Sequence, residues 1–146
     1  MKIYMSRLNI DKLLLALENE KNESIMETTK SNIKTIKNNV LQELNLPREI
    51  LKDWHQKLDN YRYISDISEL QSGCFLRWIN LKNYDNLQLS RGAFLCDIDI
   101  VNDGINIIFK NLFGKHCTLK MNELLLFQKI TDDEQVILSA LKYLQK

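Results

Sequence analysis

The chain has 146 residues, of which 45% are hydrophobic and 27% are charged, and its formal net charge is +1. These values are typical of one globular domain, or of a small domain with a helical extension, that buries a core without disulfides or metals. The nearly balanced charge excludes a global field that would attract nucleic acid or an anionic membrane.

Neither a targeting signal nor a membrane span is expected in the first part of the chain. Residues 1–10 lack an apolar core followed by a small-residue cleavage site, and the longest apolar run, Leu13–Leu17, is far too short to cross a bilayer. The three cysteines are widely spaced and leave one thiol without a partner, which is typical of a reducing compartment. We therefore expect an intracellular protein that does not enter a membrane.

Residues 1–70 are predicted to form a helical region. Asn9 or Asp11 can cap a first helix, whose apolar side chains recur at helical spacing. The polar stretch at residues 18–24 leaves open whether residues 9–45 form one helix or two.

A narrow apolar stripe follows in residues 24–45. Its members lie three, four or seven residues apart, as in a coiled-coil seam, and they are Met26, Ile33, Ile36, Val40 and Leu44. A stripe this narrow indicates one partner surface, which is either another helix of this chain or a second chain. We expect these residues to bind a protein partner or to mediate self-association, with packing inside the chain as the alternative.

Two further helices are predicted from their start signals. Pro47 is suited to the first turn of one helix, which is expected to run to about Asn60 because apolar residues recur at helical spacing from Ile50 to Tyr61. Thr131 can cap a final helix, because acidic residues follow it in the first turn, where the helix dipole favours them.

After Gly73 the apolar residues change from helical spacing to alternation, which is typical of strands. Five short strands are predicted, at residues 74–80, 92–101, 105–111, 116–121 and 124–130. Asn102–Gly104 is a strong hairpin signal. Closure of five antiparallel strands would remove exposed sheet edges. The predicted fold class is therefore α+β, with a helical region at 1–70 and a small five-stranded antiparallel barrel followed by a C-terminal helix at 71–146.

Alternation along the strands also assigns their two faces. The predicted core face consists of Phe94, Cys96, Ile98, Ile107, Phe109, Cys117 and Leu119. Asp97 and Asp99 fall on the opposite face of the second strand, as expected for the hydrated side of a half-exposed strand. A catalytic pair would also need a desolvated pocket, which the sequence does not indicate.

Several of these features are shared with a known class of small barrels. They are a glycine-led first strand at Gly73–Ile79, Gly92 at the start of a long second strand, the hairpin at Asn102–Gly104 and the apolar ending Leu124–Phe127. In this pattern the strand region resembles SH3-like barrels of the Tudor and KOW type. The resemblance implies a binding scaffold.

A second resemblance is carried by longer stretches. The segments YRYISDISELQSGCFLRWINLKN from Tyr61, LSRGAFLCDI and LLLFQKITDDEQVILSAL are similar to small uncharacterised proteins of giant nucleocytoplasmic DNA viruses. A composition rich in Asn, Lys and Ile is typical of an AT-rich genome and agrees with this resemblance. It implies a viral protein in the host cytoplasm or in a virion, and it assigns no functional residues.

The sequence contains no recognisable catalytic, metal-binding or cofactor-binding motif. Cys74, Cys96 and Cys117 form no Cys-x-x-Cys pair. His116 and Cys117 are adjacent on a predicted strand, so they point to opposite faces and suit neither a shared metal nor a catalytic pair. Nucleophile elbows and phosphate-binding loops are also absent from the sequence. We predict a protein that is not an enzyme and that binds no cofactor and no metal.

Basic and aromatic residues indicate a second possible function, which is the binding of nucleic acid. Lys30, Lys34 and Lys37 share one helical face that could contact phosphates, although a run of lysines on a helix is usually a solvated face. Trp78, Tyr84 and Phe113 could add an aromatic patch or cage at the barrel loops, although aromatic residues in a small domain usually belong to the core.

The sequence thus predicts a non-catalytic interaction module, or a subunit of a larger viral assembly, that binds its partner through the apolar stripe. The alternative is a nucleic-acid-binding accessory protein that uses the lysines of the helix and the aromatic residues of the barrel.

Overall fold

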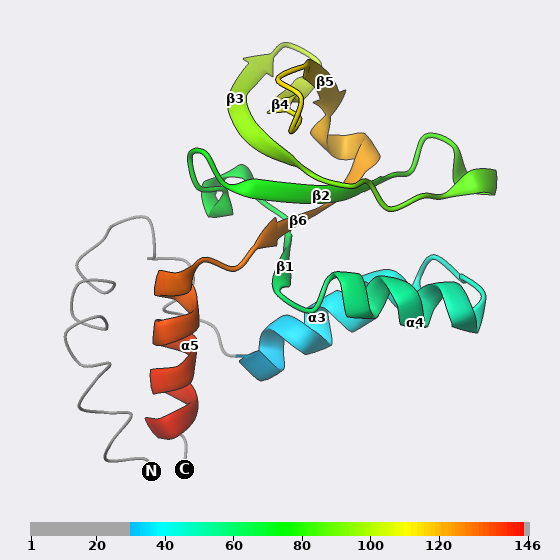
Figure 1. The fold of residues 1–146 in the computed structure, drawn as a ribbon. Helices are drawn as coiled ribbons and strands as arrows, with labels where there is room; N and C mark the ends of the chain where they lie inside the picture. The colour runs from blue at the N-terminus through cyan, green and yellow to red at the C-terminus, as the bar shows by residue number, and fades with distance from the viewer. Residues whose placement is uncertain (1–29, 145–146) are drawn as a thin grey trace. The chain divides into compact units, whose positions relative to one another are not determined.

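The structure, a computed structural model, describes residues 30–144, which form three α-helices and one six-stranded antiparallel sheet (Figure 1). The chain divides into two compact units, residues 1–40 with 130–146 and residues 41–129. The α+β class is confirmed. The predicted first helix and Met26 lie outside the described residues.

The first unit contains most of helix α3 (Lys30–Gln42) and all of helix α5 (Asp132–Leu144). Its buried apolar side chains form one cluster, joined by the partly buried Leu141, and they are Ile33, Ile130, Ile137 and Leu138. Helix α5 contributes Ile137, Leu138 and Leu141, which lie on one helical face, whereas α3 contributes Ile33.

Helix α5 begins where the sequence predicts it. The Thr131 hydroxyl oxygen accepts the backbone N–H of Glu134 at 3.1 Å, and a Glu134 carboxylate oxygen accepts the backbone N–H of Thr131 at 3.0 Å. This reciprocal pair is a capping box, which satisfies N–H groups that have no partner within the helix.

The second unit begins with a turn and helix α4 (Arg48–Lys57). Asn45 has a positive φ of 53°, a conformation that asparagine tolerates, and the chain turns there after α3. Pro47 then precedes α4 directly, and its carbonyl accepts the backbone N–H of Leu51 at 3.0 Å, so the predicted start is confirmed. The predicted end at about Asn60 is wrong, because the helix ends at Lys57, and Tyr61, whose spacing continued the helical pattern, opens a strand.

The sheet has the strand order β1-β6-β2-β3-β4-β5, and every neighbouring pair is antiparallel. Its strands are β1 (Tyr61–Ile64), β2 (Phe75–Asn80), β3 (Ala93–Val101), β4 (Gly104–Lys110), β5 (His116–Lys120) and β6 (Leu124–Lys129). The strand missing from the prediction is β1, which pairs along the outer side of β6. The predicted closed five-stranded barrel is not found, because β1 and β5 are the two edges of an open sheet.

A β-bulge at Cys96 changes which residues of β3 face the core. Leu95 lies opposite Phe109, but Asp97 lies opposite Ile108, so Cys96 is the extra residue. As a result, Leu95 is buried and Phe94 is 43% exposed. Strict alternation therefore assigned Phe94 and Cys96 to the wrong face.

The prediction for Cys117 is also wrong. It lies opposite Phe109, on the side of the core, but β5 is an edge strand and its thiol is exposed. The predictions for Ile107 and Phe109 are confirmed, since both side chains are fully buried. Ile98 and Leu119 are partly buried and pack against the same core.

The inner face of the sheet holds the larger core of the second unit. Trp78 of β2 stacks on Phe109 of β4, with ring centroids 4.1 Å apart and an angle of 29° between the planes. The buried residues of this core are Ile64, Cys74, Leu76, Ala93, Leu95, Ile107, Phe109, Leu124 and Leu126. On the outer face, Gly92 has a φ of 104°, and a Cβ atom at this position would clash with the ring of Phe75.

We expect Phe109→Ala to lower the free energy of unfolding by about 3–5 kcal/mol, because it removes a fully buried ring and leaves a cavity. Phe113→Ala is the matched control, since that ring is 88% exposed, and its effect should stay within about 0.5 kcal/mol. Urea denaturation of both variants measures the difference. Equal effects would show that the strand faces are assigned incorrectly.

Two positions of α3 allow a similar comparison in the first unit. Ile33 is 7% exposed within the helical cluster, whereas Ile36 is 47% exposed. We expect Ile33→Asp to destabilise the protein by at least about 2 kcal/mol more than Ile36→Asp does, because a carboxylate at Ile33 would be buried. Thermal unfolding followed by circular dichroism measures both. The expectation fails if Ile36→Asp is the more damaging change.

Candidate functional site

The structure divides the predicted apolar stripe of α3. Ile33 and Leu44 are buried, Val40 is half-buried and Ile36 is exposed. Ile33 packs against Ile130, Ile137 and Leu138, so at this residue the stripe packs within the chain. The described residues of the stripe therefore do not form one continuous exposed surface.

The predicted lysine face is divided in the same way. Lys34 is exposed, but Lys37 is only 4% exposed and is not available to a phosphate as it stands. Lys30 opens α3, and the exposure of its side chain is not described.

The predicted aromatic residues have different environments. Trp78 is half-buried and stacks on Phe109, so it belongs to the core. Tyr84 is 55% exposed, and its hydroxyl donates a hydrogen bond to the backbone carbonyl of Glu43 at 3.4 Å. The structure therefore does not bring these aromatic residues into one exposed patch.

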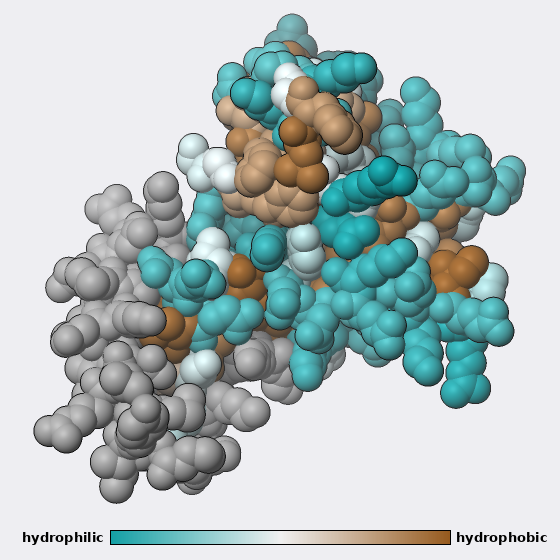
Figure 2. All heavy atoms as spheres, viewed as in Figure 1, coloured by the Kyte–Doolittle hydropathy of each residue, from teal (hydrophilic) through white to brown (hydrophobic). Residues whose placement is uncertain are grey.

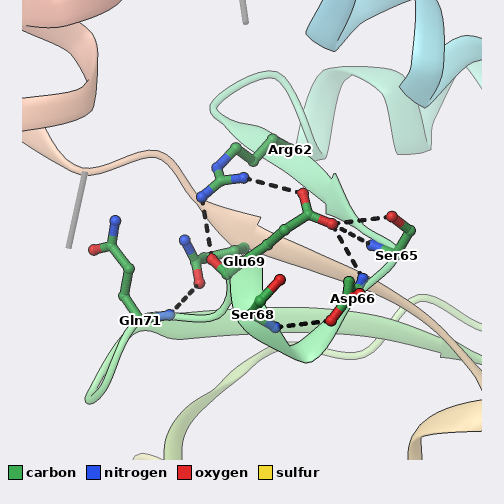
Figure 3. Close-up of polar contacts among 7 residues, drawn as sticks. Arg62, Ser65, Asp66, Ser68, Glu69 and Gln71 are labelled. Carbon is green, nitrogen blue, oxygen red and sulfur yellow. Dashed lines mark hydrogen bonds and ion pairs between the residues drawn. The ribbon is translucent and has the colours of Figure 1, made fainter. Parts of the chain in front are cut away.

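A polar cluster surrounds the carboxylate of Glu69, in the loop between β1 and β2 (Figure 3). One carboxylate oxygen accepts the backbone N–H of Ser65, the hydroxyl of Ser65 and the backbone N–H of Asp66, at 2.9–3.1 Å. The other oxygen faces the guanidinium of Arg62 at 3.5 Å, and Arg62 also donates to the backbone carbonyl of Glu69 at 3.3 Å. Asp66 completes the turn by accepting the N–H of Ser68 at 3.0 Å.

This arrangement indicates a structural role for Glu69. Both of its carboxylate oxygens have partners, and three of those contacts are with residues at the end of β1. Farther along the same loop, the side-chain carbonyl of the buried Gln128 accepts the backbone N–H of Gln71 at 3.0 Å. The cluster thus fixes the loop to β1 and β6 and sets the position of Ser65.

Beside this loop lies a pocket of about 460 Å³. Its walls come from the end of β1, the residue after β2, the start of β4, the short 3-10 turn η4 (Met121–Glu123) and β6. The apolar side chains of the walls include Tyr63, Leu81, Ile105, Met121, Leu124 and Leu126. The backbone N–H of Leu81 donates to the carbonyl of Glu123 at 2.8 Å, which ties two of these walls together.

The chemistry of the pocket is that of an apolar binding site. None of its lining residues carries a charge at neutral pH, and the polar side chains among them are those of Tyr63, Ser65 and Asn122. Leu81, Ile105 and Met121 are each half-buried, so their side chains are accessible from solvent. The Ser65 hydroxyl already donates to Glu69 at 2.9 Å. An apolar group with one or two polar contacts fits this lining.

A second exposed feature is the loop that joins β4 to β5. Leu112 and Phe113 at its tip are 70% and 88% exposed. Lys110, Lys115 and His116 beside them are exposed as well. Figure 2 shows hydrophobic side chains gathered on the visible face of the region that Figure 1 labels β3, β4 and β5.

Hydrogen bonds hold this loop in one conformation. The side-chain oxygen of Asn111 accepts the backbone N–H groups of Phe113 and Lys115 at 2.9 and 3.0 Å. The Asn111 N–H donates to the Lys115 carbonyl, and the Gly114 N–H donates to the Asn111 carbonyl. Phe113 was predicted as a member of an aromatic patch, and it is exposed, whereas Leu112 was not among the predicted site residues.

Other site types find no support within residues 30–144. No group of three His, Cys, Asp or Glu side chains in this part of the chain could hold a metal ion. No helix among these residues combines the length and apolar character needed to cross a membrane. Asp97 and Asp99 are both exposed, as predicted for the hydrated side of β3.

Two tyrosines of β1 are electrostatically perturbed. Burial raises the pKa of Tyr63 above its ordinary value, and the carboxylates of Glu69 and Glu43 raise it further. Burial also raises the pKa of Tyr61, and this effect is opposed by the positive charge of Arg77. For both tyrosines, burial is the larger cause of the raised pKa.

The raised pKa values predict a loss of stability at alkaline pH. In the unfolded chain the phenols ionise near pH 10, whereas in the folded protein they stay neutral to higher pH. The unfolded state therefore loses these protons first. The stability that the two tyrosines contribute to the folded state is complete below about pH 10 and is lost as the pH rises through their pKa values in the folded protein. We expect the double variant Tyr61→Phe, Tyr63→Phe to lose less stability than the wild type between about pH 9 and pH 11. Urea midpoints at both pH values test this, and parallel losses in the two proteins would contradict it.

Comparisons with known proteins found no match, so a function can be inferred only from the geometry of the structure. No protein-family model matches the sequence, and no curated protein and no solved structure shows a significant match to it. The pocket beside β1 and the tip of the β4–β5 loop are therefore interpreted from their own chemistry.

Proposed function

We propose that the protein is a non-catalytic interaction module, acting as a subunit or adaptor of a larger assembly, and that a partner inserts an apolar group into the pocket beside β1. The observation that carries this proposal is the pocket itself, with a volume of about 460 Å³ and a lining without charged residues. Ligand-binding pockets typically have volumes in this range and predominantly apolar walls with a few polar groups.

The surroundings of the pocket favour binding over catalysis. A catalytic base must be free to take a proton from a bound group. The carboxylate of Glu69, which contacts the lining residue Ser65, accepts two backbone N–H groups and the Ser65 hydroxyl and faces Arg62. These contacts hold Glu69 in a structural role and leave apolar burial as the main interaction that the pocket offers.

The energy available to such a contact is substantial. Full burial of one Leu, Met or Phe side chain contributes roughly 1.5–3 kcal/mol. Interfaces depend on a few anchors of this kind that fill well-packed pockets. The walls come from a sheet, a 3-10 turn and a loop fixed by Glu69, so a partner would meet a preformed site.

The resemblances found in the sequence extend this proposal. The likeness to SH3-like domains suggests a binding scaffold, here with an open sheet of six strands. The likeness to proteins of giant viruses suggests a viral assembly in the host cytoplasm or in a virion. The alternative function is nucleic-acid binding through the lysines of α3 and the aromatic residues of the strand region. Lys37 is buried and Trp78 stacks in the core, so neither residue supports this alternative.

Leu81→Asp tests the proposal, because it places a charge in the pocket wall at a half-buried position. Leu87→Asp is the matched control, since Leu87 is also half-buried and does not line the pocket. Each protein would serve as bait in extracts of its native source, with quantitative mass spectrometry of the captured proteins and nucleic acid. We expect a partner that is captured by the wild type and by Leu87→Asp and is reduced at least about tenfold with Leu81→Asp, or roughly 1.4 kcal/mol.

Circular dichroism must show that both variants are folded. Capture of the same protein partners by Leu81→Asp and the wild type would refute the pocket as the binding site. Capture of nucleic acid alone, lost steeply as salt is added, would favour the alternative function.

A further inference from the structure

We infer that the β4–β5 loop binds the surface of an anionic lipid bilayer. In this arrangement Leu112 and Phe113 enter the boundary between headgroups and acyl chains, and Lys110 and Lys115 contact the lipid phosphates. The inference goes beyond the proposed function, because no residue of this loop lines the pocket beside β1. It concerns contact with one face of a bilayer, which requires no membrane-spanning helix.

The tip of the loop offers two apolar side chains to such a surface. Phe113 is 88% exposed, the highest value among the large hydrophobic side chains of residues 30–144, and Leu112 beside it is 70% exposed. Their neighbours Asn111 and Gly114 carry no charge. Entry of the tip into a bilayer would therefore remove apolar surface from water without desolvating a charged side chain.

The backbone of the loop is also suited to an apolar environment. The backbone N–H groups of residues 111 and 113–115 all donate hydrogen bonds within the loop, at 2.9–3.0 Å. Because an unpaired backbone group is costly inside a bilayer, this internal pairing makes insertion of the tip less unfavourable. The same bonds order the loop before it binds, so little conformational entropy is lost on binding.

Positive charge flanks the apolar tip on both sides. Lys110 precedes the tip and Lys115 follows it, both are exposed, and neither forms an ion pair among the described residues. Lys120 does not add to this charge, because it lies at the other end of β5 and its Nζ atom is 3.6 Å from a carboxylate oxygen of Asp103. Two lysines without ion pairs beside an apolar tip are complementary to the surface of an anionic leaflet.

The acidic residues on the outer face of β3 lie farther from the tip. Asp97 is opposite Ile108, which lies two residues before Lys110 on β4, and Asp99 is opposite Asn106, four residues before Lys110. At about 3.4 Å per residue, the two acids are roughly 7 and 14 Å farther from the loop than Lys110 is. A tip inserted by about 5–10 Å would place the lysines among the headgroups and keep the acids away from the anionic surface.

The turn at the opposite end of β4 shows that exposure alone does not make such a site. Ile100, next to the β3–β4 turn, is 71% exposed. Its strand neighbour is Asp99, and the turn contributes Asp103, whose charge Lys120 offsets. This end of the sheet therefore has an exposed apolar side chain but no excess of positive charge that would attract an anionic leaflet.

The tip favours a bilayer over single-stranded nucleic acid. Sites for single strands combine a basic groove that follows the backbone with aromatic rings on which the bases stack. Phe113 offers a ring, but Leu112 offers no stacking surface. The expectation that the protein does not enter a membrane was based on the net charge of the whole chain and on the lack of a long apolar run. Neither property describes the local surface of this loop.

Flotation with lipid vesicles tests the inference. One set of vesicles consists of phosphatidylcholine, and a second set contains about 30% phosphatidylserine, which supplies the negative charge. We expect the wild type to bind the anionic vesicles at least about tenfold more tightly than the neutral vesicles, because each lysine near an anionic surface contributes roughly fivefold in affinity. Added salt should weaken this binding.

Matched variants separate the tip from the rest of the surface. Phe113→Ala should weaken binding to anionic vesicles about tenfold, because it removes the larger inserted side chain. Ile100→Ala is the control, since it shortens a highly exposed apolar side chain at the opposite turn, and it should bind like the wild type. The double variant Lys110→Gln, Lys115→Gln should bind anionic and neutral vesicles alike. All four positions are exposed, so the variants should stay folded, which circular dichroism checks.

A fluorescent reporter distinguishes insertion from adsorption. Phe113→Trp should emit at a shorter wavelength when anionic vesicles are added, because the indole ring would leave water. The wild type provides the reference spectrum for Trp54 and Trp78.

The inference fails if the wild type does not bind anionic vesicles at lipid concentrations up to about 1 mM. It also fails if Phe113→Ala and Ile100→Ala bind alike, or if the emission of Phe113→Trp does not change on binding. Binding of a labelled single-stranded oligonucleotide at the tip, without binding of anionic vesicles, would assign the loop to nucleic acid instead. These measurements need only purified protein and lipid, so their outcome is independent of whether a partner is captured through the pocket.

Discussion

The β-bulge at Cys96 allows Leu95 and Ile98 to face the same side of the sheet although they are three residues apart. Without the extra residue, one of the two would turn toward solvent, and its burial, worth roughly 1.5–3 kcal/mol, would be lost. A bulge also bends its strand and increases the local twist. The strand β3 is visibly curved in Figure 1, and the curvature brings β4 over the inner face of β2, where Phe109 stacks on Trp78.

The features that could be predicted from the sequence are those that depend on neighbouring residues. Pro47 and Thr131 mark helix starts because each acts within one turn, and Asn102–Gly104 forms a hairpin for the same reason. The bulge could not be predicted, because its position depends on the pairing of β3 with β4. The strand β1 has only four residues, and its apolar positions continued the spacing of the preceding helix.

The candidate site was harder to predict than the fold, since exposure depends on residues far apart in the sequence. Lys37 lies on the polar side of α3 by its sequence pattern, yet the folded chain buries it. The pocket combines residues from Tyr63 to Leu126, and no local pattern joins them. Phe113 is different, because its exposure follows from its place in a tight turn that local hydrogen bonds define.

The two edges of the sheet explain why side chains, rather than backbone pairing, should recruit a partner. At β1, the chain itself satisfies flanking N–H groups, since Tyr61 donates to the carbonyl of Leu58 and Ser65 donates to Glu69. At β5, exposed His116 and Lys120 place polar groups and charge on the edge, which discourages strand addition. Under the proposed function, recognition would therefore fall to the apolar side chains of the pocket beside β1.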